Sequence, residues 1–178
     1  MRRLSRFIIP SLLLLFLALP PLAADSSFSA HIGGNFFRYE TSYLTTGGSY
    51  LNRLRSDLEL DFGAFFGIAT EKNDEGETVP SFLIPVNLGL NFLFPTEKVT
   101  FLLGSGITPV FNFSDKDAGG NEFYMGPYIA AGARLQIHPV MSWFVQGRQD
   151  LLFGGDDWIN TATRLTTGIN FTLGQSSR

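Results

Sequence analysis

The sequence contains no cysteine. This absence excludes a fold held together by disulfides, a cysteine nucleophile and metal sites made of thiolates. It also excludes a lipoprotein anchor, because that anchor requires a lipid-modified cysteine at the mature N-terminus. Stability must therefore come from packing, hydrogen bonds and ion pairs alone.

Histidine is scarce as well, with only His31 and His138 in the chain. Neither lies in a GxSxG nucleophile motif or an HExxH metalloprotease motif. His138 precedes Pro139 in an expected tight turn, and His31 alternates with apolar neighbours so that it faces the interior of the expected fold. We therefore expect that the chain is not an enzyme and that it holds neither a metal nor a cofactor.

Positive charge is limited, with 13 Lys and Arg residues against 16 Asp and Glu residues. Three of the basic residues are Arg2, Arg3 and Arg6, so the chain beyond residue 24 has 10 basic and 16 acidic residues and a net charge of −6. Nucleic-acid binding requires clustered cations, which this chain lacks. We therefore expect no nucleic-acid partner.

Long apolar runs are also missing, apart from one at the N-terminus from Phe7 to Leu19. Arginines precede that run, and the small residues Ala23 and Ala24 follow it, which is typical of a cleavable secretory signal peptide. We therefore interpret residues 1–24 as the signal peptide and residues 25–178 as a single domain. No other segment reaches the ~18 apolar residues of a helical span, so any membrane crossing requires strands.

The remaining chain alternates between apolar and polar residues with a period of two, which is typical of strands. Over residues 58–68, for example, Leu58, Leu60 and Phe62 alternate with Glu59 and Asp61. A barrel that closes with both termini at one end needs an even number of strands, so we expect one more strand within residues 41–56. The other seven expected strands lie in residues 26–37, 58–68, 81–94, 99–113, 123–137, 141–153 and 163–173.

The connections between these strands alternate in kind. Residues 95–98 and 138–141 are short and contain proline, whereas residues 71–78, 114–122 and 154–158 are longer, polar and rich in glycine or acidic residues. Short turns at one end and longer loops at the other are typical of outer-membrane barrels. The pattern predicts an all-β fold, an eight-stranded antiparallel up-and-down transmembrane β-barrel.

The composition of the two strand faces supports lipid on the outside. The less apolar face is mostly Gly, Asn, Thr and Ser, and charged residues make up only 16% of the chain. A soluble sandwich or barrel, which is the alternative, would place many charged residues on its outer face. Aromatic residues near the strand ends are typical of interfacial girdles, and these are Phe92, Phe94, Phe111, Phe113, Phe123, Trp143 and Trp158.

The stretches FLIPVNLGLNFLF, VTFLLGSGITPVF and YMGPYIAAGARLQIHP follow one another in an order that resembles the small outer-membrane β-barrel superfamily of OmpX-, OmpW- and OmpA-like proteins. The closing strand is also similar to the signal read by the barrel-assembly machinery, although GQSSR follows where the family often ends on an aromatic residue. The resemblance implies insertion into the outer membrane, with lipid and that machinery as partners. The residues that carry the signal are Thr166, Gly168, Phe171 and Leu173.

Several charged residues fall on the interior face by the alternation. In the resembling family such residues pair and plug the lumen, because charges in a narrow interior must be paired or hydrated. The alternative is a slipped register that places some of them at the rims. The expected charge network consists of Glu59, Asp61, Arg134, Arg148, Asp150 and Arg164.

The sequence leaves three alternatives for the role of such a barrel. The first is a structural or surface-interaction barrel, whose acidic loops bind an extracellular partner or merely remain solvated. The second is a small OmpW-like channel or transporter for a hydrophobic or small solute, which an apolar upper lumen around Phe65, Leu83 and Val110 would favour. The third is a secreted soluble binding barrel.

Overall fold

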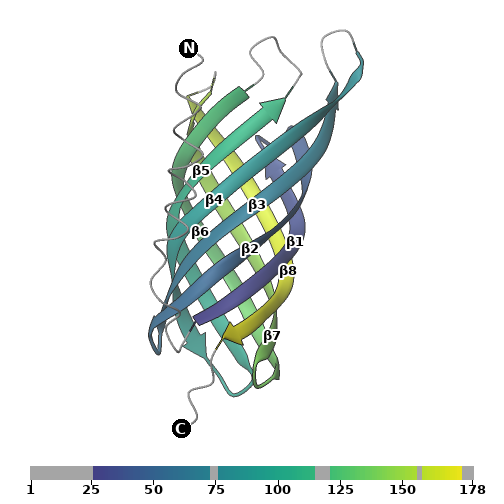
Figure 1. Cartoon of the computed structure of the whole chain (residues 1–178). Helices are drawn as coiled ribbons and strands as arrows, with labels where there is room; N and C mark the ends of the chain where they lie inside the picture. Colours follow the sequence, from purple (N-terminus) through teal and green to yellow (C-terminus); the bar gives the residue numbers. More distant parts are fainter. Residues whose placement is uncertain (1–25, 73–75, 115–120, 156–157, 174–178) are drawn as a thin grey trace.

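The computed structural model describes residues 26–72, 76–114, 121–155 and 158–173, and these form one closed barrel of eight antiparallel strands (Figure 1). Each strand pairs with the next, and β8 pairs with β1 from Ser26↔Leu173 to Phe37↔Ala162. The prediction of an eight-stranded up-and-down barrel is confirmed. The strands are β1 (Ser26–Phe37), β2 (Thr41–Arg55), β3 (Leu58–Lys72), β4 (Thr78–Pro95), β5 (Val99–Ser114), β6 (Asn121–His138), β7 (Met141–Gly154) and β8 (Ile159–Leu173).

Some predictions lie outside the described residues. The proposed signal peptide is one of them, and so are several acidic positions of the loops. These positions are Asp74, Glu75, Asp115, Asp117, Asp156 and Asp157.

Strand β2 occupies the segment where the sequence required one more strand. It pairs with β1 from Phe37↔Thr41 to Ser26↔Asn52 and with β3 from Leu44↔Ile68 to Arg55↔Leu58, with a register irregularity between Arg53 and Arg55. The periodicity of β2 is weak because Thr45, Thr46, Gly47, Gly48 and Ser49 are small or polar on both faces. Its place in the barrel therefore follows from its neighbours and from closure.

The connections differ between the two ends of the barrel. At the end where β1 begins and β8 ends, which is the lower end in Figure 1, the strands are joined by residues 56–57, 96–98 and 139–140. At the opposite end, longer connections join β3 to β4, β5 to β6 and β7 to β8. The β1–β2 connection at this end is an exception, because it is a tight turn over residues 38–40.

That tight turn has an uncommon backbone. Arg38 and Tyr39 adopt φ angles of 54° and 55°, and the Glu40 amide donates a 3.2 Å hydrogen bond to the Phe37 carbonyl. Two consecutive residues with positive φ are typical of the hairpin turns whose twist matches that of the flanking strands, and Asn-Gly usually occupies them. The Arg38 amide also bonds the Thr161 carbonyl at 2.9 Å, which ties the turn to β8.

The upper edge of the barrel is uneven. The pairing of β2 with β3 ends at Leu44↔Ile68, whereas β3 continues along β4 to Lys72↔Thr78. The β3–β4 hairpin therefore extends beyond the β1–β2 turn, as Figure 1 shows. The β1–β2 turn is the lowest point of that edge in the described part of the chain.

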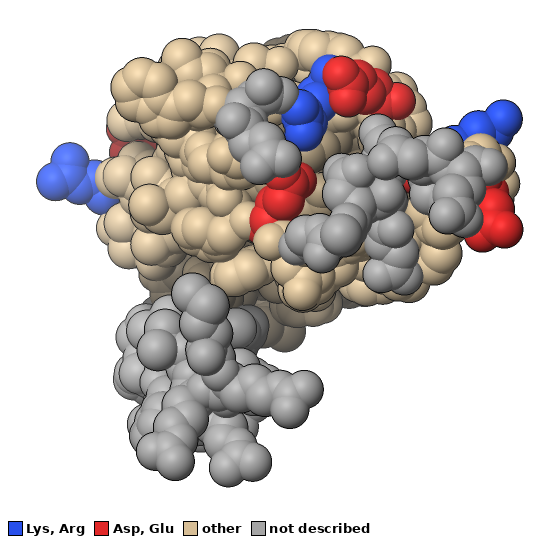
Figure 2. Space-filling model, turned by 90° about the horizontal axis from the view of Figure 1, so that it is seen from above, with Lys and Arg blue, Asp and Glu red and all other residues tan. Residues whose placement is uncertain are grey.

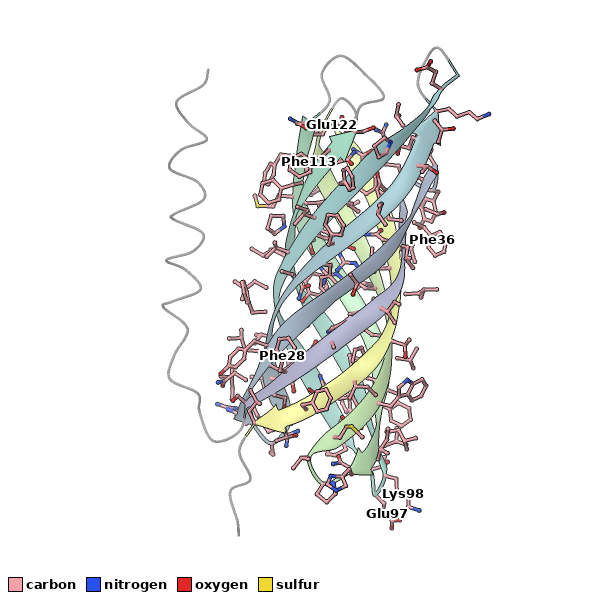
Figure 3. All side chains as sticks on the ribbon, turned by 45° about the vertical axis from the view of Figure 1, so that its right-hand side comes forward. Phe28, Phe36, Glu97, Lys98, Phe113 and Glu122 are labelled. Carbon is pink, nitrogen blue, oxygen red and sulfur yellow. The ribbon has the colours of Figure 1, made fainter. Side chains whose placement is uncertain are left out.

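The outer face of the barrel is apolar. Alternation along each strand directs large side chains outward, such as Phe28 (47% exposed) near the lower end and Phe36 and Phe113 near the upper end (Figure 3). Six of the seven aromatic residues expected near strand ends are exposed, and Phe111 is half-buried. The six are Phe92, Phe94, Phe113, Phe123, Trp143 and Trp158. Among the described residues, no helix is both long enough and apolar enough to cross a membrane.

Candidate functional site

The barrel interior gathers the polar and charged side chains of all eight strands. The six charged residues that the alternation placed on the interior face all lie inside, and five of them are buried. Arg134 is the sixth, and it is partly exposed at the lower opening of the lumen. The interior forms layers along the barrel axis, which are described below from the lower end upward.

The lowest layer contains an ion pair across the lumen. Arg134 of β6 donates from Nη1 and Nη2 to the two carboxylate oxygens of Glu59 on β3, at 2.8 and 2.6 Å. Asn91 Nδ2 adds a 3.2 Å hydrogen bond to Glu59. Such a two-pronged pair is the geometry in which arginine binds carboxylate most strongly. A cavity of about 100 Å³ lies beside it, lined in part by Arg53, Thr100 and other polar residues.

The central layer contains a second charged group. Arg148 Nε donates to Asp150 Oδ1 at 2.9 Å, and Thr108 Oγ1 donates to the same oxygen at 2.9 Å. A further guanidinium nitrogen of Arg148 bonds Thr108 Oγ1. Arg164 Nη2 lies 3.9 Å from the other oxygen of Asp150, so this carboxylate is shared between two arginines.

Aromatic rings complete the surroundings of these two arginines. The Arg148 guanidinium lies over the Tyr128 ring at 3.3 Å from its centroid, and that of Arg164 lies over Phe65 at 4.6 Å. Cations over aromatic faces are attracted by the ring quadrupole, and the attraction increases away from water. Tyr128 fits because β4 has Gly89 opposite its hydroxyl, where a Cβ atom would collide with the phenol oxygen.

Asp61 is the one residue of the six that forms none of these ion pairs. It is 6% exposed, and its Oδ1 has no hydrogen-bond partner among the described residues. His31 lies in the same region, where its ring is between Phe65 and Phe144 at centroid distances of 5.0 and 4.7 Å. The structure thus forms two separate charged groups rather than one network. No cluster of three metal-ligating side chains occurs in the described ranges.

Above the charged layers, an apolar cluster fills the lumen. Its members come from seven strands, and all are at most 3% exposed. Leu83 and Val110 belong to it, but Phe65 does not, because Phe65 lies one layer lower against His31 and Arg164. All three side chains are buried in the lumen, and the apolar region that would favour a transporter includes Leu83 and Val110 but not Phe65. The apolar plug, as we call this cluster, consists of Phe37, Tyr43, Leu83, Val110, Tyr124, Leu152 and Ala162.

The mouth above the apolar plug contains two carboxylates that the sequence did not single out as interior residues. Glu71 accepts hydrogen bonds from Thr41 Oγ1 at 2.6 Å and from Ser114 Oγ at 3.0 Å. Glu122 accepts one from the Tyr124 hydroxyl at 2.6 Å. Alternation beyond the expected strand ends would have placed both inward. Figure 2 shows acidic and basic side chains at this upper end, surrounded by other residues.

The residues of the expected assembly signal lie in the second half of β8. Thr166 is 6% exposed and points into the lumen, whereas Phe171 and Leu173 are 43% and 41% exposed on the outer face. Gly168 pairs with His31 of β1. The apolar members of the signal are therefore on the outer face of the closing strand.

No protein-family model matches the chain, and the comparison with curated proteins finds no match. Solved structures do match. Neisserial surface protein A is 13% identical with a TM-score of 0.66, covering 83% of this chain and 96% of that chain. Outer membrane protein OprG from Pseudomonas aeruginosa is 9% identical with a TM-score of 0.57, covering 85% and 97%, respectively. The outer membrane protein AlkL is 12% identical with a TM-score of 0.57, covering 90% and 95%. At these identities the likeness concerns architecture alone, and the chain has the closed eight-stranded fold of the small outer-membrane β-barrels.

Proposed function

We propose that this chain is a non-enzymatic outer-membrane barrel with a closed lumen, which has a structural or surface-interaction role. The single observation that carries this proposal is the combination of an apolar outer wall with a filled interior. Leu83, Tyr124 and Leu152 in the apolar plug are each 0% exposed, so their side chains are fully buried inside the barrel.

The outer wall supports a location in lipid. Side chains such as Ile129 of β6 and Leu44 of β2 are 68% and 64% exposed and lie on different sides of the barrel. A soluble protein rarely exposes a contiguous apolar surface on this scale. A bilayer accommodates it, and barrel closure satisfies the backbone hydrogen bonds that lipid cannot. The same surface argues against the secreted soluble barrel.

The orientation in this proposal places the short turns and both strand termini on the periplasmic side. The longer connections then face the outside, with the Glu71 and Glu122 carboxylates at the mouth. The assembly machinery would read Phe171 and Leu173 on the outer face of β8. An extracellular partner would meet the acidic upper end, and its attraction would weaken with salt.

Two measurements on one preparation test the proposal. Outer-membrane fractionation with heat-modifiable gel mobility shows whether the chain is a folded membrane barrel. Planar-bilayer recording then shows whether the barrel conducts, and we expect no large stable pore. Recovery of the chain in the soluble periplasmic fraction would contradict the location, whereas a steady open pore would contradict the closed lumen.

The second candidate is a small channel or transporter for a hydrophobic solute, and one observation favours it. The apolar plug lies directly below the mouth, where an apolar solute arriving from the upper end would meet Phe37 and Tyr43. Transport would require this plug to rearrange. Uptake of a fluorescent apolar solute by vesicles that contain the protein, compared with vesicles that contain a Leu83→Trp variant, distinguishes the two roles.

A further inference from the structure

The lipid-facing wall formed by β5, β6, β7 and β8 contains a groove of about 550 Å³. One row of paired residues crosses it, namely Leu103, Ala131, Gly147 and Leu165 on successive strands. The two middle members are small, and the two leucines are each 54% exposed. The groove is therefore a depression with a floor of Ala131 and Gly147 between leucine walls.

A projection lies directly beside this depression. Ile129 is two residues from Ala131 on β6, which places it on the same outer face, and it is 68% exposed. The wall thus carries a protruding side chain directly beside a depression. A surface with this arrangement is self-complementary, because a twofold axis brings the projection of each copy to the hole of the other.

The row of paired residues above the floor carries two polar side chains on this lipid-facing wall, Gln149 and Thr163. Gln149 pairs with Ile129 on one side and with Thr163 on the other. Thr163 Oγ1 donates to Gln149 Oε1 at 2.6 Å, and the Tyr39 hydroxyl lies 2.9 Å from Thr163 Oγ1. Gln149 Nε2 donates one long bond, 3.4 Å, to the Asp150 carbonyl. An amide nitrogen carries two hydrogens, and the second has no acceptor among the described residues.

The depth of Gln149 in the membrane decides which groups could accept a hydrogen bond from the second hydrogen of its amide nitrogen. It lies four residues below Phe153 and six above Trp143, both exposed aromatic residues near the strand ends. At ~3.3 Å per residue and a tilt of ~40°, Gln149 lies roughly 10 Å below the level of Phe153 and roughly 15 Å above the level of Trp143, measured along the barrel axis. Acyl chains at this depth offer no acceptor, and a polar side chain inside the membrane commonly marks a functional contact.

We propose that this groove is a homodimer interface, in which a second copy of the chain docks its Ile129 into the depression over Ala131 and Gly147. The Gln149 amide is both donor and acceptor, so it bonds the Gln149 or Thr163 oxygens of the second copy across the twofold axis. Small residues that allow close approach and side-chain amides that bond across the contact are typical of interfaces inside membranes. This inference rests on the proposed function, because it requires a lipid-embedded barrel.

The experiment uses the full chain folded into density-matched detergent micelles and examined by sedimentation equilibrium. The test variant is Gly147→Leu, where a Cβ atom would meet only Leu165 Cδ2, 3.4 Å away, and the backbone oxygen of Ala131 at 4.0 Å. The matched control is Ala64→Leu, which adds a leucine to the outer face of β3 instead. We expect a dimer whose dissociation constant rises about tenfold or more in Gly147→Leu, equivalent to ~1.4 kcal/mol, and does not change in Ala64→Leu.

Cross-linking in phospholipid vesicles tests the reciprocal contact. Because the chain has no cysteine, Ile129→Cys chains mixed with Gly147→Cys chains should form a mixed disulfide dimer, and Ala64→Cys chains should not. Heat-modifiable mobility of the same samples reports insertion. A folded, inserted monomer, or a dimer insensitive to Gly147→Leu, overturns the inference alone. Native mass spectrometry would reveal a folded monomer that instead retains a lipid, which the Gly147→Leu variant loses. That result would overturn the homodimer in favour of a lipid as the occupant of the groove. Failure of the chain to insert into vesicles would overturn the proposed function as well.

Discussion

Arg134 and Glu59 are 75 residues apart in sequence, yet they form a two-pronged ion pair across the lumen, with N–O distances of 2.8 and 2.6 Å. The pair joins β3 to β6, strands that are not hydrogen-bonded neighbours in the barrel. It is therefore a strut across the interior rather than a contact along the wall.

Loss of one partner of this strut should be costly. We expect Glu59→Gln to lower the free energy of unfolding by roughly 3–5 kcal/mol, because the partly buried Arg134 charge would lose its counter-ion. Urea unfolding in lipid vesicles measures the change. Glu97→Gln in the exposed short turn is the control and should change stability little. The double variant Glu59→Leu with Arg134→Met should recover much of the loss, and a loss as large as that of the single variant would contradict this account.

The apolar plug should seal the barrel. We expect Leu152→Ala, at a side chain that is 0% exposed, to reduce stability by about 2–5 kcal/mol and to increase brief conductance events in planar bilayers. Leu151→Ala is a matched control, since Leu151 is the next residue and is 40% exposed on the outer face. Equal conductance in the two variants would show that the plug is not what closes the lumen.

The Tyr39 hydroxyl should hold the β1–β2 turn against β8. It lies 2.9 Å from Thr163 Oγ1 and 3.4 Å from Gln149 Oε1. We expect Tyr39→Phe to increase hydrogen exchange of the turn amides, including that of Arg38, because the hydroxyl contact is lost while the ring remains. Thr172→Val, on the same strand at the opposite end of the barrel, serves as the control. Unchanged exchange in Tyr39→Phe would mean that the backbone bond from Arg38 to Thr161 suffices.

Assembly in cells should depend on the outward residues at the end of β8. We expect Phe171→Ala to reduce the heat-modifiable, folded fraction in outer membranes severalfold while leaving spontaneous refolding into vesicles nearly unchanged, because vesicles lack the machinery. Leu165→Ala removes an outward side chain from the same strand outside the expected signal, and it should leave both readouts near wild type. An equal defect in both settings would mark Phe171 as a folding residue and not as a recognition residue.

Alternation determined most of the architecture from sequence, because a period of two assigns each residue to a face once the strand is known. Glu59 and Asp61 could be placed inside in this way. Their different surroundings could not be anticipated, because cross-lumen neighbours depend on the stagger of eight strands and on the space that residues such as Gly89 leave open. The stagger also places Phe65 one layer below Leu83, which alternation within each strand does not predict.

The mouth carboxylates were missed because the strands extend farther than their apolar runs. The predicted strands end before Glu71 and begin after Glu122, whereas the structure places these two residues near the end of β3 and at the start of β6. Their hydroxyl partners, Thr41 and Tyr124, carry no sequence signal that links them to a carboxylate. Contacts of this kind become visible only once the register is known.

The unequal hairpin heights determine what a macromolecule would touch when it approaches the proposed outer surface. Within the described ranges the β3–β4 hairpin projects highest, whereas the β1–β2 turn at Tyr39 ends nearer the outer apolar wall. An epitope grafted beside Gly76 would stand clear of the bilayer for an antibody. The same graft at Tyr39 would lie among lipid headgroups, so this small barrel offers a one-sided platform for surface display.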